Sequence, residues 1–112
     1  MTYAKRVDVN QNEIVLALRA VGVEVFISSG IGHGFPDLVC DFYGKLLLIE
    51  VKDGSKPPSK RKLTRAEDDF YGKWHLHMSI VGSVSEALGL ARLYRGDPAN
   101  VLELPKLYPY PS

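Results

Sequence analysis

The chain has 112 residues, 46% of them hydrophobic, which is enough for one compact domain and too few for two. Its single cysteine, Cys40, excludes an internal disulfide, and no apolar run reaches the roughly 18 residues that cross a bilayer. The net charge of +1 conceals a basic cluster after Lys52, and we expect a cytoplasmic protein with no membrane partner.

Seven regular elements are predicted, in the order helix, three strands, helix, strand, helix. Their approximate ranges are helix 10–22, strands 23–29, 36–42 and 45–51, helix 64–74, strand 75–81 and helix 83–96. This order predicts an α/β domain with a mixed sheet flanked by helices. We expect a single domain over residues 1–104, followed by a proline- and tyrosine-rich arm, 105–112, that packs on its own subunit or on a neighbour.

The stretch GHGFPDLVCDFYGKLLLIEVKDG places charged residues in segments that are predicted to form the core. If the hairpin turns at Tyr43-Gly44, opposed residues have numbers that sum to 87, so Asp37 lies across from Glu50. Their Cβ atoms would then be about 5 Å apart on one face, and two carboxylates at that distance repel by roughly 3 kcal/mol. A bound Mg²⁺ would offset this repulsion, because Mg²⁺ prefers oxygen ligands.

Strand alternation adds a lysine to the same face. Glu50 and Lys52 are two positions apart, whereas Ile49 and Val51 point to the other face. The backbone carbonyl of Val51 is a candidate further ligand. A lysine beside a metal can have its pKa lowered and can orient or deprotonate an attacking water. A metal with an activated water on a basic surface is the chemistry of phosphodiester hydrolysis.

The basic cluster follows directly after the lysine strand. We interpret its side chains as contacts to the phosphate backbone, which supply affinity without reading the sequence. The predicted DNA-binding residues are Lys56, Lys60, Arg61, Lys62 and Arg65, with His33 in the glycine-rich loop before Asp37 as a further phosphate contact.

The segment PDLVCDFYGKLLLIEVK resembles the signature of the PD-(D/E)XK nucleases, with Asp37, Glu50 and Lys52 as its three residues. The form GFPDL, then EVK, a basic loop and LT is most similar to the VRR-NUC branch, the virus-type replication and repair nucleases. This resemblance implies a restriction-endonuclease-like fold and a homodimer of phage or bacterial origin. It also implies cleavage of branched DNA such as four-way junctions with Mg²⁺, for which Mn²⁺ can substitute.

Two glutamates have both a family interpretation and a local one. Glu13 corresponds to the helical glutamate that completes the metal site in such nucleases, often through water, but with Asn10 it also forms a capping-box pattern. Glu67 falls where the family tends to have glutamine, and we interpret it as a capping partner of Thr64. His75 and His77 share a strand face, but no third ligand is spaced to complete a metal site with them.

Other interpretations of the acidic pair and of the whole protein stay open. Asp37 could be an exposed residue after proline, and Glu50 with Lys52 an edge-strand ion pair that contributes about 0–1 kcal/mol. For this interpretation, register and spacing would have to agree by accident. At the level of the protein, the rivals are a restriction-type endonuclease that reads a short duplex sequence and a catalytically silent DNA-binding module.

Overall fold

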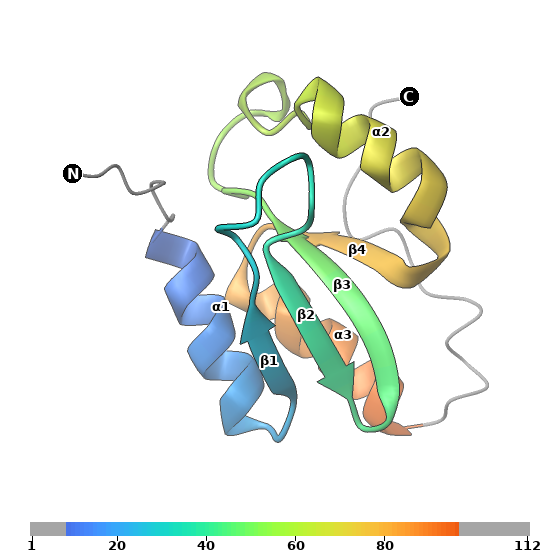
Figure 1. Ribbon diagram of the computed structural model, residues 1–112. Helices are drawn as coiled ribbons and strands as arrows, with labels where there is room; N and C mark the ends of the chain where they lie inside the picture. Colours follow the sequence, from blue (N-terminus) through green and yellow to red (C-terminus); the bar gives the residue numbers. More distant parts are fainter. Residues whose placement is uncertain (1–8, 97–112) are drawn as a thin grey trace.

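The computed structural model describes residues 9–96, and within them it has the predicted order of elements (Figure 1). The arm predicted at 105–112 lies outside the described residues. No helix in the described part of the chain is long and apolar enough to cross a membrane. The elements are α1 (Val9–Ala20), β1 (Glu24–Ile27), β2 (Leu38–Phe42), β3 (Lys45–Val51), η1 (Pro58–Lys60), α2 (Arg65–Trp74), η2 (His75–His77), β4 (Met78–Val81) and α3 (Val84–Gly96).

The four strands form one mixed sheet in the order β1-β2-β3-β4, so the predicted α/β class is confirmed. β1, β2 and β3 are antiparallel, and β4 returns parallel to β3 after α2 has crossed over. The hairpin turns at Tyr43 and Gly44, whose φ angles are both positive, as a tight two-residue turn requires. Leu38 pairs with Ile49, so the predicted register is confirmed.

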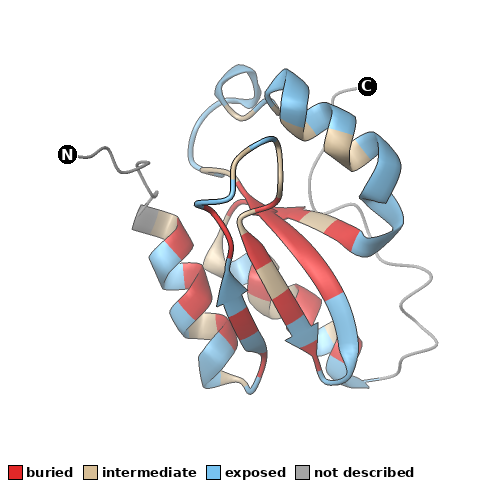
Figure 2. Ribbon diagram, in the orientation of Figure 1, coloured by how far each residue is buried: buried red, intermediate tan, exposed pale blue. Residues whose placement is uncertain are grey.

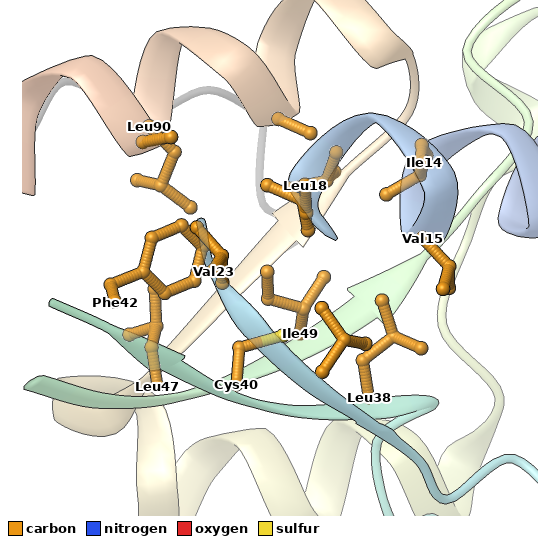
Figure 3. Packing of buried hydrophobic residues seen from close by; sticks show 14 of the residues in the cluster. Ile14, Val15, Leu18, Val23, Leu38, Cys40, Phe42, Leu47, Ile49 and Leu90 are labelled. Atoms are coloured by element: carbon orange, nitrogen blue, oxygen red, sulfur yellow. The ribbon is translucent and has the colours of Figure 1, made fainter. Parts of the chain in front are cut away.

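The hydrophobic core lies between one face of the sheet and the two helices α1 and α3 (Figure 3). Ile49 and Leu38 of the sheet and Leu18 of α1 are fully buried there. Cys40 is buried among them, and burial raises the pKa of its thiol to about 12, which confirms it as part of the core rather than a reactive thiol. Helix α1 ends where Gly22, at a φ of 90°, allows the chain to turn back towards β1.

Helix α2 lies on the opposite face of the sheet and is more exposed than its pattern suggests. None of its residues is buried (Figure 2). Ala66, which we expected to turn inward, is exposed, and Phe70 is only half-buried. The prediction for Leu76 is also wrong: residues 75–77 form a 3₁₀ turn instead of the start of the strand, and this side chain is 80% exposed.

Candidate functional site

Asp37 and Glu50 meet at the end of the β2–β3 hairpin. One step beyond the Leu38–Ile49 pair, the register brings Asp37 opposite Glu50. Counted from the turn, this is a non-hydrogen-bonded pair, the type in which opposed side chains lie closer together. The backbone N–H of Val51 donates to Oδ2 of Asp37 at 2.9 Å, which ties the Asp37 carboxylate to β3. The two acids that the sequence pairs are therefore neighbours in the fold.

Glu50 is a carboxyl group in a place where ionisation is costly. It is 3% exposed. Burial raises its pKa to about 10, with further contributions from the charges of Asp37 and Glu67 and from a hydrogen bond with Glu67, while Lys52 acts in the opposite direction. A cation bound between Asp37 and Glu50 would reverse this balance, because it would favour the ionised form of both acids.

Lys52 is held between two acids. Its Nζ lies 2.8 Å from Oε1 of Glu67 and 3.6 Å from Oε2 of Glu50. Burial alone would lower the pKa of Lys52, but the hydrogen bond and charge of Glu67, together with Glu50 and Asp37, outweigh burial and raise it. In this arrangement Lys52 is a charged donor. The lowered pKa that we expect for a lysine beside a bound metal therefore remains a prediction.

Glu67 forms the predicted cap and also bonds to Lys52, a contact that the sequence did not predict. Its side chain accepts from the Thr64 N–H at 2.9 Å, and its own N–H donates to the Thr64 hydroxyl, so the capping box is confirmed. The same oxygen, Oε1, accepts from Lys52. Burial alone would raise the pKa of Glu67, but the hydrogen bonds from Lys52 and Thr64 lower it. The cap therefore positions a charged acid against the lysine.

Asn10 is a site residue that the sequence pattern did not reveal. It lies inside α1, and its Nδ2 donates to the backbone carbonyl of Lys52 at 2.8 Å. This bond attaches α1 to the end of β3. Glu13, the predicted helical acid, is exposed, so any metal contact it makes remains a prediction. The only signal for Asn10 was its place at the start of the helix, which we interpreted as a cap.

The backbone of Val51 faces Asp37. In an antiparallel ladder the N–H and C=O of one residue point to the same neighbour, and the Val51 N–H points to Asp37. The register places Pro36 opposite Val51, and proline has no N–H to donate to that carbonyl. The Pro36 carbonyl, in turn, accepts from the Ser28 hydroxyl at 2.8 Å. The Val51 carbonyl, which points to the same side of β3 as its N–H, remains a candidate ligand, as predicted from the sequence.

The donor set fits a hard divalent ion only if small molecules complete the coordination. Within residues 9–96, no group of three or more His, Cys, Asp or Glu side chains is arranged to hold a metal. Asp37, Glu50 and the Val51 carbonyl offer oxygen donors from adjoining strands. Mg²⁺ commonly keeps several waters and binds one or two carboxylates together with substrate phosphate, so such a set suits it.

The basic loop begins and ends at the site. Lys52 precedes it, and Glu67 in the first turn of α2 bonds back to Lys52. Close backbone contacts hold the surroundings: Gly54 packs on Gly82, and a Cβ on Gly34 would come within 2.2 Å of the Ala66 carbonyl oxygen. Among the predicted phosphate contacts on this loop and beside it, Arg61 is half-buried. The others are exposed: Lys56, Lys60, Lys62, Arg65 and His33.

The two remaining histidines lie away from this arrangement. His75 and His77 are exposed residues of η2, and His75 Nδ1 lies 3.3 Å from the carbonyl of Gly72. His77 packs beside Trp74, with ring centroids 6.4 Å apart. The shared strand face that we expected for these histidines is not formed, because the strand begins at Met78.

Comparison with known proteins gave no match: no family model, no characterised protein and no solved structure matches this chain.

Proposed function

We propose that the protein is a metal-dependent endonuclease that hydrolyses phosphodiester bonds in DNA. The observation that carries the proposal is the opposed pair Asp37 and Glu50, with Lys52 on the same face of the sheet. Glu50 is buried and Asp37 beside it is half-buried, so ionising both acids is costly unless a cation joins them. A basic loop leaves the sheet at the same point. The resemblance to the VRR-NUC branch supports this function on the same three residues.

Each residue of the site has a defined part in this chemistry. Asp37, Glu50 and the Val51 carbonyl would hold Mg²⁺, or Mn²⁺ in its place. The bound ion supplies polarisation of a phosphate oxygen and a lowered pKa for water. Lys52, kept charged by Glu67, donates hydrogen bonds that orient the attacking water or stabilise negative charge on the phosphate. Glu67 thus positions Lys52.

The basic loop provides the DNA contacts of this proposal. Its exposed lysines and arginines suit the phosphate backbone, which carries no sequence information. Selectivity for branched DNA, four-way junctions above all, rests on the family resemblance. So does a homodimer, in which two sites would cut the two strands of a symmetric junction. In this proposal Glu13 assists through water, and His33 contacts a phosphate.

A cleavage assay tests the proposal directly. Purified protein is incubated with Mg²⁺ or Mn²⁺ and with labelled four-way junction, flap, single-stranded and plain duplex DNA. We expect cleavage of the branched substrates and a loss of rate of about 10²–10⁴-fold in Lys52→Ala, the range for a positioned proton donor or acceptor. Lys45→Ala, at an exposed lysine of the same strand, is the matched control and should cut normally.

Three results of the assay contradict the proposal. Binding without cleavage under both metals favours the catalytically silent module. Cutting confined to one duplex motif favours the restriction-type enzyme. Equal rates for wild type and Lys52→Ala would remove this lysine from the mechanism.

A further inference from the structure

The open face of the sheet carries an apolar row beside the acidic site. Phe26, Val39, Leu48 and Met78 are directly paired across all four strands, so their side chains share one face. This is the face of Glu50, which follows Leu48 by two positions. Phe26 at the edge is 66% exposed. Of the helices that the structure describes, α2 packs over part of this face, whereas α1 and α3 cover the opposite face (Figure 1).

A groove of about 470 Å³ runs along this face. Its floor is formed by Val39, Leu46 and Leu48, and its wall by Phe35, Phe70 and Trp74, with His77 also lining it. The wall is a row of aromatic rings in contact. Phe35 meets Phe70 edge-on, with ring centroids 5.3 Å apart, and Phe70 stacks on Trp74, with ring centroids 5.7 Å apart.

The groove contains two large apolar side chains that are exposed to water. Leu46 is 68% exposed and Trp74 46% exposed. A contiguous exposed apolar surface of this kind marks a place where another chain segment or molecule binds. Among the residues that the structure describes, no lysine, arginine, aspartate or glutamate lines the groove, so this lining does not suit the phosphates of DNA.

The described part of the chain ends next to this groove. In the last turn of α3, Tyr94 packs on Phe42, with ring centroids 5.3 Å apart, and the Arg95 guanidinium lies 5.6 Å from the centre of the Tyr43 ring. The C-terminal end of α3 is therefore beside the β2–β3 turn, as Figure 1 shows. Leu46, at the near end of the groove, is two residues beyond that turn.

The residues that follow Gly96 have the length and chemistry to fill the groove. Sixteen residues, Asp97 to Ser112, can span about 50 Å when extended, whereas the seven residues of β3 span about 24 Å. The first four residues, DPAN, have short side chains and can carry the chain around the end of the sheet from the α3 face to the α2 face. The apolar positions come after them: Val101, Leu102, Leu104, Leu107, Tyr108 and Tyr110.

We propose that the C-terminal segment, residues 97–112, docks in this groove on its own subunit. Attachment at the groove's end gives the segment an effective concentration in the millimolar range, which favours it over a second molecule in dilute solution. Docking buries Leu46 and Trp74 without a new partner. The proposal does not depend on the nuclease activity.

Trp74 reports on docking, because it is the only tryptophan of the chain and lies in the groove. In the full-length protein we compare wild type with the double variant Leu104→Asp, Leu107→Asp. We expect a red-shifted emission and an acrylamide quenching constant about twofold higher, because release of the segment exposes the indole to water. The control, Asn100→Asp with Ser112→Asp, adds the same charge at polar positions and should match wild type.

A groove variant makes the test reciprocal. Leu46→Asp changes an exposed residue, so the fold should persist, and we expect the same change in Trp74 emission. Combined with the segment variant it should add nothing further, because both release the same contact. Circular dichroism checks that each variant is folded.

Three outcomes overturn the proposal. Equal quenching of Trp74 in wild type and the segment variant means that the segment does not cover the groove. Protection that grows with protein concentration, from about 1 to 100 µM, means that a second copy fills it. Protection that arises only when DNA is added means that nucleic acid fills it.

Discussion

On β3, Ile49 and Val51 point into the core beneath α1 and α3, whereas Glu50 and Lys52 point to the face that carries α2. The first face is closed by two helices and carries the hydrophobic core. The second is divided along the strand, with an acidic end at Glu50 and an apolar groove from Leu48 to Leu46. One face of this sheet maintains the fold, and the other is the face on which we propose that a metal and the C-terminal segment bind.

This difference has an electrostatic cause. Ile49 and Val51 gain stability by leaving water, and nothing further is required of them. Glu50, equally buried, gains none while it is charged and needs a proton or a cation. The fold therefore contains a site whose stability depends on what is bound there.

The largest expected change in stability comes from a substitution on the face of the sheet that α1 and α3 cover. Ile49→Ala should lower the free energy of unfolding by about 2–5 kcal/mol, because it leaves a cavity among fully buried side chains. Leu76→Ala, at a side chain that is 80% exposed, is the control and should change it by less than about 0.5 kcal/mol. Chemical denaturation measures both. Similar losses for the two variants would contradict the burial that separates them.

Metal binding should raise the stability of the protein only through the acidic site on the face that carries α2. At a free Mg²⁺ or Mn²⁺ concentration near 100 times the dissociation constant, wild type should gain about 2.7 kcal/mol of stability, measured by thermal unfolding. Asp37→Asn should gain much less. Without metal it should be at least as stable as wild type, because the charge of Asp37 contributes to the raised pKa of Glu50 and so adds to the free-energy cost of keeping this residue protonated. An equal metal response in both proteins would mean that the ion binds elsewhere.

The smallest effect is a dependence on pH in the metal-free protein. Burial raises the pKa of Glu50 to about 10 from 4.5, so between these values the folded state holds a proton that the unfolded state has lost. Stability should therefore fall as pH rises, by up to about 1.4 kcal/mol from about pH 6.5 to 7.5. Glu50→Gln should remove this dependence, as denaturation in the presence of a chelator can show. An identical slope in wild type and variant would argue against a protonated Glu50.

The hairpin is the part of the fold that could be predicted most fully. Tyr43-Gly44 specifies a two-residue turn, the turn specifies the register, and the register places Asp37 opposite Glu50. The Thr64 cap of α2 and the Gly22 end of α1 are equally local and are confirmed. For the start of β4 the local pattern was misleading. The alternation of Leu76 with two histidines suggested a strand, but these three residues form a 3₁₀ turn that precedes it.

The site could be predicted only as far as local spacing reaches. Glu67 was interpreted as a cap and is one, but its bond to Lys52 depends on where α2 lies over the sheet. Asn10 bonds to a carbonyl 42 residues away, and no periodicity encodes that distance. The raised pKa of Lys52 likewise follows from acids on three different segments.

The sequence by itself determined the order of the elements, the turn and the opposed acids, because each depends on neighbours within one hairpin or one helix turn. Only the tertiary structure decided which partners Lys52 has, that the Val51 N–H donates to the Asp37 carboxylate, and that an aromatic groove adjoins the site. The reason is physical: these features arise where helices pack on strands, and that packing depends on contacts between segments far apart in the chain.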